Sequence, residues 1–266
     1  MPRRRVVRKR SSQKVRKGIS LPSKPGPSTS KTTTKVDLRK LKPISLKEHE
    51  KWFKSRFGSK NGEKFQRIAS SAAFAYDFAS HESDAFPYYV YVAEEYGLDI
   101  SKITPTKTQS CLILNLQTEF DPKTKKVKTL SMPELQKKYK KYYRDSYFAM
   151  QAQAALTRSY LRKLFPSGKV TLYRATRDTP LKIPGLEWEL AQKDSDRAIL
   201  SGTLSRKVAE DFAKQERKKG GKSRVIKVTV PIEDIIDCYL TNSGFVHKEY
   251  EFRYVNRKAL KKFRRK

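Results

Sequence analysis

The chain has 266 residues, 37% of them hydrophobic, which is enough for one large or two modest folded domains. Lys and Arg number 60 against 27 Asp and Glu, so the formal net charge at pH 7 is +33. This balance favours polyanionic partners, above all nucleic acid or a nucleoprotein assembly. No run approaches the roughly 18 apolar residues of a membrane-spanning helix, and the chain does not open on an apolar secretory signal. We therefore expect no membrane partner, and a location in the cytoplasm or inside a virion.

Residues 1–45 are expected to form a disordered basic tail. They contain 15 Lys and Arg but one acidic residue, Asp37, and a Ser/Thr/Pro/Lys-rich stretch follows the first arginines. Such a segment has too little apolar surface to offset the entropy of ordering. As a polycation it would bind a phosphate backbone through counterion release, although a solubilising or targeting arm has the same composition.

Residues 46–132 are expected to be mainly helical. Trp52, Phe53 and Phe57 indicate a short amphipathic helix that breaks near Gly58 to Gly62, and two further runs carry apolar residues at helical spacing. The apolar run Ser110–Leu116 fits a buried strand or a turn of buried helix. Lys123–Lys128 is expected to be an exposed basic connector.

The strongest helical pattern runs from about Pro133 to Leu164. Proline at the first helical position and Glu134 in the first turn are typical of a helix start. Tyrosines and other apolar residues recur on one side and lysines on the other. Interleaved basic and aromatic residues also occur in single-strand nucleic-acid binding, but this spacing favours a core stripe under a solvated face.

Three pieces of the last hundred residues carry the functional prediction. The first is the β-branched run Lys169–Thr176, which contains Tyr173 and Arg174. The second is Ser201-Gly202-Thr203, followed by a helix that Ser205 caps. The third is a late strand that opens on Glu249-Tyr250-Glu251, just after a Ser-Gly turn and Phe245. Period two places Glu249, Glu251 and Arg253 on one face of that strand, and the alternative interpretation of these charges is an ordinary half-solvated strand.

An arginine on a strand, then Ser-x-Thr before a capped helix, then Glu-x-Glu on a late strand: this order resembles the Arg–Ser–Glu class of mono-ADP-ribosyltransferases. That class includes the enzyme components of binary toxins and transferase domains carried by phages. The resemblance covers roughly Leu161 to Val255. It implies an α+β fold with a two-sheet ADP-ribosyltransferase core over residues 133–256, including its leading helix, and leaves 257–266 as a basic C-terminal tail.

The resemblance also implies a role for each motif residue. Glu251 would stabilise the oxocarbenium-like centre that forms when the bond from nicotinamide to ribose breaks. Ser201 would hold Glu251 and the ribose, and Thr203 would support the strand edge. Arg174, with its neighbour Tyr173, would bind NAD, the guanidinium supplying donors to the pyrophosphate or the adjoining ribose. NAD is thus expected as co-substrate, and no metal is implied.

Glu249 is expected to select arginine as the acceptor. Removing a proton from a guanidinium at pH 7 would cost roughly 7 kcal/mol, since its pKa lies about five units higher. A carboxylate that takes this proton as the new bond forms avoids most of the cost. Phe245 would pack against the acceptor or, equally, anchor the loop. The expected partner is a protein with an accessible arginine, on a nucleic-acid-associated assembly.

Three alternatives remain open from the sequence. The chain could be a nucleic-acid-binding structural protein of a viral particle that carries a transferase domain. The transferase could act on a nucleobase or an RNA end. The same residues could also hydrolyse NAD without transfer if water reaches the ribose.

Overall fold

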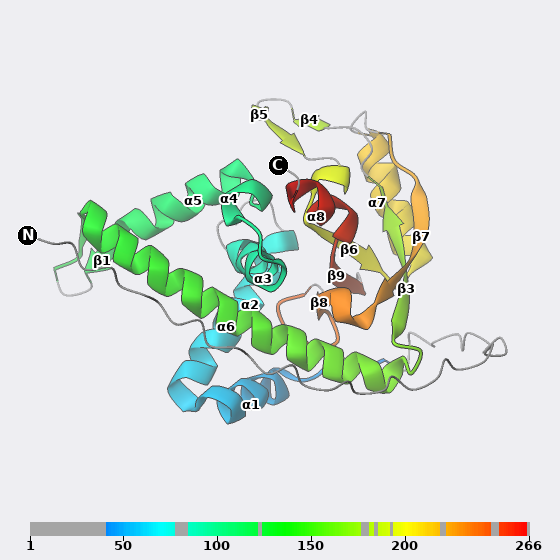
Figure 1. Ribbon diagram of the computed structural model, residues 1–266, viewed down its shortest axis with the longest axis horizontal. Helices are drawn as coiled ribbons and strands as arrows, with labels where there is room; N and C mark the ends of the chain where they lie inside the picture. Colours follow the sequence, from blue (N-terminus) through cyan, green and yellow to red (C-terminus); the bar gives the residue numbers. More distant parts are fainter. Residues whose placement is uncertain are drawn as a thin grey trace, which may run out of the picture. The chain divides into compact units, whose positions relative to one another are not determined.

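The computed structural model describes residues 41–77, 85–121, 124–176, 181–183, 186–191, 194–218, 222–245 and 250–264 (Figure 1). The fold is α+β, as the sequence predicts, and residues 38–266 form one compact unit. The first part is mainly helical: α1 (Leu46–Phe57), α2 (Ser59–Asp77), α3 (Phe86–Tyr96), α4 (Ile100–Ile103), α5 (Thr106–Gln117), β1 (Thr118–Asp121), β2 (Lys126–Thr129) and α6 (Met132–Leu164). The second part contains most strands: β3 (Lys169–Ala175), β4 (Leu181–Ile183), β5 (Leu186–Ala191), β6 (Ile199–Thr203), α7 (Arg206–Lys218), β7 (Val225–Pro231), β8 (Ile235–Cys238), β9 (Glu251–Val255) and α8 (Arg257–Arg264).

The strands of the described residues make one five-stranded sheet and two hairpins. The sheet has the order β7-β3-β6-β9-β8, with antiparallel neighbours throughout, and the hairpins are β1–β2 and β4–β5. Helix α7 packs on β3, β6 and β7, and α6 packs on β8 as well as on α2 and α3. Figure 1 shows α6 extending from the β1–β2 hairpin to the start of β3. This helix therefore joins the helical part to the sheet.

One hydrophobic core runs through both parts. The same cluster of buried side chains contains Phe53 of α1, Met150 of α6, Ile199 of β6 and Leu260 of α8. Helix α6 begins as its sequence predicts, with a capping box in which Glu134 bonds back to Ser131. Because the core is shared, residues 46–132 do not form a separate domain.

Three segments narrow or correct the sequence expectation. Ser110–Leu116 is helical within α5, because Leu112 and Leu116, four residues apart, are buried while Leu114 between them is exposed. The connector expected over Lys123–Lys128 is exposed where it is described, and it contains the start of β2. Residues 257–264, expected as a tail, form α8, whose Ala259 and Leu260 are buried.

The expected N-terminal tail ends earlier than residue 45. The Lys42 carbonyl accepts a hydrogen bond from the Tyr160 hydroxyl at 2.9 Å, and the Ile44 amide donates to the Leu240 carbonyl at 2.9 Å. Residues 42–44 therefore lie on the folded part, while residues 1–40 of the predicted tail lie outside the described residues. Within the described part of the chain, none of the helices has both the length and the apolar character needed to cross a bilayer.

Helices α1 and α2 approach each other most closely at Gly62. A methyl group on this residue would lie 2.6 Å from the Cα and amide nitrogen of Lys54, which are backbone atoms that cannot rotate away. The sequence predicted a break from Gly58 to Gly62, but the turn is confined to Gly58, and Gly62 lies within α2. The glycine at position 62 therefore allows the two helices to pack.

Gly62→Ala is expected to lower the free energy of unfolding by about 1–3 kcal/mol, since the helices must separate to admit the methyl group. Urea denaturation followed by circular dichroism measures the change. Ser71→Ala, at an exposed position of the same helix, is the matched control and should change stability by less than about 0.5 kcal/mol. Equal stability of Gly62→Ala and the wild-type chain would show that the close approach is not maintained in solution.

Candidate active site

The predicted motif residues lie on three strands around β6. Register pairs Thr203 of β6 with Tyr173 of β3 on one side and with Glu251 of β9 on the other. Ser201, two residues before Thr203, pairs with Arg253. Since paired residues of antiparallel strands project to the same face, Ser201, Thr203, Glu251 and Arg253 share one face of the sheet.

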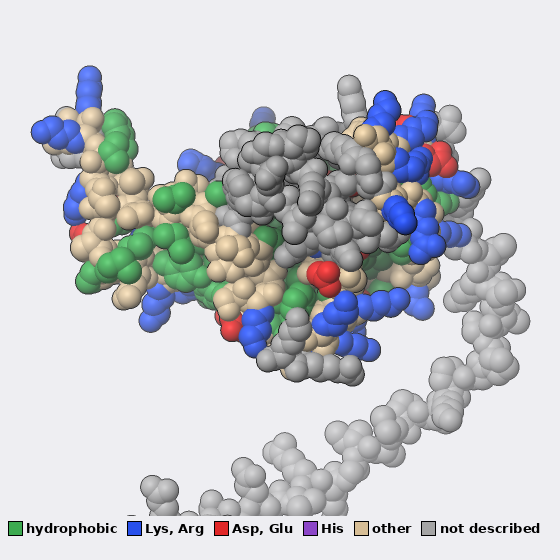
Figure 2. All heavy atoms as spheres, turned by 90° about the horizontal axis from the view of Figure 1, so that it is seen from above, with side chains coloured by type: hydrophobic (Ala, Val, Ile, Leu, Met, Phe, Trp, Pro, Cys, Tyr) green, Lys and Arg blue, Asp and Glu red, His purple; other side chains and the backbone are tan. Residues whose placement is uncertain are grey.

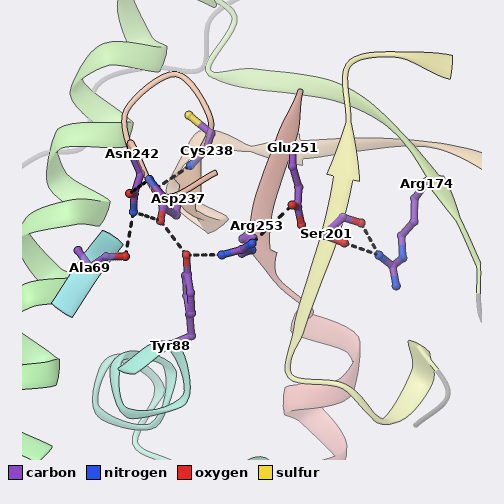
Figure 3. A network of polar contacts seen from close by, with 10 residues as sticks. Ala69, Tyr88, Arg174, Ser201, Asp237, Cys238, Asn242, Glu251 and Arg253 are labelled. Carbon is purple, nitrogen blue, oxygen red and sulfur yellow. Dashed lines mark hydrogen bonds and ion pairs between the residues drawn. The ribbon is translucent and has the colours of Figure 1, made fainter. Parts of the chain in front are cut away.

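Arg174 contacts Ser201 where β3 and β6 diverge. The ladder between these strands consists of the single pair Tyr173–Thr203, so the Ser201 carbonyl beyond it is not bonded to the β3 backbone. The Arg174 guanidinium takes that place: its Nη1 donates to the Ser201 carbonyl and lies 3.5 Å from the Ser201 hydroxyl (Figure 3). The arginine and the serine of the predicted motif are therefore adjacent.

Asp194 orients Arg174 from the segment before β6. Its Oδ2 accepts from Arg174 Nε at 3.0 Å, and its Oδ1 accepts from Nη2, a two-point carboxylate–guanidinium pair. The Arg174 side chain is 7% exposed, so this pair is well shielded from water. Sequence reasoning missed Asp194. The signal available was the pair Asp194 and Asp196, two carboxylates within three residues of a very basic chain.

Glu251 is buried on β9, next to the Ser201 strand. Its Oε2 lies 3.5 Å from Arg253 Nη2, and this pair is on the same face as Ser201. All five residues of β9 are buried, so the alternative of a half-solvated strand is wrong. The strand begins at Glu251, since Tyr250 has a left-handed φ of 49°. Glu249 lies outside the described residues.

Arg253 connects Glu251 to a buried polar network (Figure 3). Its side chain is fully buried, its Nη1 donates to the Tyr88 hydroxyl at 2.7 Å, and its guanidinium lies 4.3 Å from the centre of the Phe245 ring. Phe245 is 4% exposed. It is thus a buried loop anchor covered by Arg253, and the expected contact between this ring and an acceptor is wrong, because the ring has almost no accessible surface.

Asp237 lies at the centre of this network. It accepts from Tyr88 and Asn242 at Oδ2, both at 2.7 Å, and from Gln153 at Oδ1 at 2.9 Å. Burial raises the pKa of Asp237 to about 7, an effect that the donors from Tyr88 and Asn242 and the nearby Arg253 oppose. Burial also raises the pKa of the Cys238 thiol to about 12, so this cysteine is an inert core residue.

The network reaches His49 of α1. The imidazole is buried, its Nε2 is 2.7 Å from Gln153 Oε1, and it packs edge-on against Phe53. Burial lowers the pKa of His49 below its usual value. The helices α1, α3 and α6 therefore contribute polar side chains to the same network as the strands β8 and β9. No periodic pattern in the sequence predicts this network, since its members are far apart along the chain.

The lowered pKa of His49 predicts a loss of stability in mild acid. In the unfolded state His49 takes up a proton near pH 6.5, whereas in the folded state it does so only at lower pH. The contribution of His49 to the free energy of unfolding is therefore fully present above about pH 6.5 and is lost as the pH falls below it. Asp237, whose pKa burial raises to about 7, acts in the opposite direction, because the folded state binds a proton there that the unfolded state does not. Between pH 7.5 and pH 5.5 the wild type is therefore expected to lose more stability, or gain less, than His49→Gln does. Urea denaturation at both pH values measures the difference. An equal change of the free energy of unfolding in both chains would show that His49 does not contribute to its pH dependence.

The other residues that the sequence predicts at the NAD site are Thr203 and Tyr173. The Thr203 hydroxyl accepts from the Ser205 amide at 3.1 Å, and the Ser205 hydroxyl accepts from the Val208 amide at 3.3 Å, as expected of a helix cap. Gly202 faces Leu172, whose side chain a methyl group would approach to 3.2 Å. Tyr173 is half-buried on β3. Within the described ranges, no group of three or more His, Cys, Asp and Glu side chains is arranged to hold a metal ion.

Comparisons of the chain with protein-family models, with curated proteins and with solved structures gave no match.

Proposed function

We propose that the chain is an NAD-dependent mono-ADP-ribosyltransferase that modifies arginine on a protein. The observation that supports this most strongly is the arrangement around β6: Arg174 contacts Ser201, and Glu251 projects from the neighbouring strand on the same face as Ser201. These three residues come from separate segments of the chain. In this proposal the five-stranded sheet is the central part of the two-sheet core that the resemblance implies.

Arg174 would bind the pyrophosphate of NAD. A guanidinium has five N–H donors, of which Asp194 engages two and the Ser201 carbonyl one. The donors that remain would take the phosphate oxygens, while Asp194 holds the plane of the guanidinium fixed. This arrangement is preorganised, since the arginine need not be ordered when the dinucleotide binds.

Glu251 would stabilise the charge that develops on the ribose. Cleavage of the bond to nicotinamide gives an oxocarbenium-like centre, and a carboxylate beside it stabilises the transition state more than the ground state. The Ser201 hydroxyl would position the ribose and Glu251. Thr203, opposite Glu251 in the ladder, would fix the spacing of β6 and β9. Tyr173, opposite Thr203 on the other side, would border the same site.

Glu249 would orient the arginine acceptor and receive its proton, as argued from the sequence. Transfer then forms a bond between a guanidinium nitrogen and the ribose carbon, while nicotinamide leaves with the electrons of the broken bond. The high positive charge would direct the enzyme to a target on an acidic, nucleic-acid-associated assembly in the cytoplasm. Delivery from a virion is compatible with this role.

A second candidate, nucleic-acid binding, is favoured by charge alone. Lys258, Lys261, Lys262 and Arg264 are exposed on α8, and the formal net charge is +33. Binding of this kind would weaken steeply with salt, because it depends on counterion release. It is independent of Glu251, so Glu251→Ala would leave it intact. If the transferase instead modifies RNA or a nucleobase, the ADP-ribosylated product would be destroyed by nuclease and would resist protease.

The test is a transfer assay with a small acceptor. The full chain is incubated with NAD and agmatine, which carries a guanidinium, and nicotinamide and ADP-ribosyl-agmatine are quantified by mass spectrometry. The expected result is formation of both products in step, with no adduct on an equal concentration of cadaverine, a primary diamine. Nicotinamide release without an adduct would indicate NAD hydrolysis. No consumption of NAD would contradict the proposal.

A further inference from the structure

An apolar groove lies between α5 and the first turns of α6. Its volume is about 460 Å³, and its lining is formed mostly by apolar side chains of α3, α5 and α6. The apolar lining residues include Phe86, Leu112, Ile113, Leu116, Met132 and Leu135. Phe86, Leu112 and Leu116 are buried and form its floor, while Ile113 and Met132 stand at its rim and are 49% and 66% exposed.

Exposed apolar surface is concentrated at this end of the molecule. Of the nine large hydrophobic side chains exposed in the described part of the chain, five fall between Ile113 and Met132. Besides the two at the rim these are Leu114 on α5 and the cross-strand pair Phe120 and Val127 on the β1–β2 hairpin. Figure 2 shows hydrophobic side chains gathered at the left of the view, over these elements. A patch of this kind on a soluble domain is typical of an interaction site.

The surroundings of the groove are basic. Between residues 98 and 144 the chain has eleven Lys and Arg against four Asp and Glu. Two of these carboxylates already have cationic partners: Glu119 lies 3.2 Å from Lys138, and Glu134 lies 2.8 Å from Lys128. Lys140, one helical turn after the lining residue Gln136 of α6, has an exposed side chain. The part of the chain that forms the groove is therefore strongly basic, while the floor of the groove is apolar.

From this arrangement we propose that the groove binds an amphipathic helix of a partner protein, with an apolar stripe and acidic flanks. Two helices already form its walls, so a third helix would complete a small bundle and bury the rim residues Ile113 and Met132. Apolar side chains spaced three and four residues apart would enter the groove. Acidic residues beside them would be attracted by the positive charge of this part of the chain, which includes Lys140.

Charge favours an acidic helix over two other possible occupants of the groove. A second copy of this chain would bring another formal charge of +33 to a basic rim, which repels it. The chain's own first 45 residues contain 15 Lys and Arg and are repelled for the same reason. An acidic helix is attracted, and its association is expected to be fast at low salt and slower at high salt.

The test uses designed peptides and the full chain. Fluorescein-labelled amphipathic helices of 18 residues are made in pairs. The two peptides of a pair have the same leucine stripe and differ only in the residues beside it, which are Glu in one and Lys in the other. The number of leucines in the stripe varies from pair to pair. Fluorescence anisotropy is expected to show saturable binding of an acidic helix and at least tenfold weaker binding of its Lys partner. Ile113→Asp and Met132→Asp, which alter exposed rim residues, should each weaken binding tenfold or more. Phe212→Asp, at a 41% exposed apolar residue of α7, is the matched control and should bind as the wild type does.

Several results would overturn the proposal. These are binding of none of the acidic helices, equal binding of Glu- and Lys-flanked peptides, or rim variants that bind as tightly as Phe212→Asp. Self-association of the wild type in sedimentation velocity that Ile113→Asp abolishes would assign the groove to a second copy. Displacement of a fluorescent fatty acid, with no peptide bound, would assign it to a lipid. Because NAD turnover is measured separately, failure here leaves the proposed enzyme activity untouched.

Discussion

Glu251→Ala is expected to lower NAD hydrolysis and ADP-ribose transfer together, by about a thousandfold. The carboxylate acts in the step that both reactions share, cleavage of the bond to nicotinamide, and removing one preorganised stabilising group from such a site typically costs 10²- to 10³-fold in rate. Glu251 is buried opposite Thr203, on the same face of the sheet as Ser201, where its effect on a developing charge is little screened by water. Nicotinamide release and label transfer from NAD, measured on the same samples, give the two rates.

Glu249→Ala is the matched comparison, because it removes a carboxylate two residues away. It is expected to keep NAD hydrolysis and to lose transfer to arginine, since Glu249 would act on the acceptor and not on the ribose. Glu251→Gln, close in shape to the native residue, should behave as Glu251→Ala does and separates lost charge from lost packing. Wild-type transfer by both alanine variants would mean that this pair of glutamates is not the catalytic pair.

Arg253→Met is expected to lower the free energy of unfolding by about 3–5 kcal/mol, the usual effect of removing one partner of a buried charged pair. The Arg253 side chain is fully buried between Tyr88, Phe245 and Glu251. Methionine fills part of the volume but leaves Glu251 without a cationic neighbour and the Tyr88 hydroxyl without its donor. Urea denaturation at pH 7.5, followed by circular dichroism, measures the change.

Arg206→Met tests whether burial causes this effect. Arg206 is 71% exposed and pairs with Glu210 one turn along α7, so its removal should cost about 0.3–0.5 kcal/mol. A loss of the same size in both variants would show that the network contributes no special stability. If Arg253 also positions Glu251 for catalysis, Arg253→Lys, which keeps the charge, should retain more NAD turnover than Arg253→Met does.

Helices and strands that have a clear local pattern of residues were predicted from the sequence. The long helix was predicted from about Pro133 and begins at Met132, and the late strand was predicted from Glu249 and begins at Glu251. Both predictions rest on helix-start signals and on spacings of 3.6 and 2 residues. The apolar run that contains Leu112 and Leu116 was compatible with a helix or a strand, because so short a run shows neither a period of 3.6 residues nor one of 2. Helix α8 was missed because its many lysines and arginines conceal two buried residues, Ala259 and Leu260.

The candidate site was predictable only where a motif marked it. Arg174, Ser201 and Glu251 were selected by their order along the chain, and the structure places them on neighbouring strands. Asp194 and Arg253, which hold Arg174 and Glu251, were not predicted to be site residues, although period two placed Arg253 on the same face as Glu251. Arg253 meets Tyr88, 165 residues away, and only the tertiary fold brings them together.

The most direct measurement is NAD binding by isothermal titration calorimetry, with wild type, Arg174→Lys and the exposed control Arg206→Lys. A lysine keeps the charge but cannot make the forked contacts of a guanidinium, so Arg174→Lys is expected to bind NAD at least about tenfold more weakly than the other two chains. One NAD per wild-type chain, with this loss, would support a dinucleotide site around Arg174, Ser201 and Glu251. A wild-type chain that binds no NAD, or an Arg174→Lys chain that binds it equally well, would contradict it.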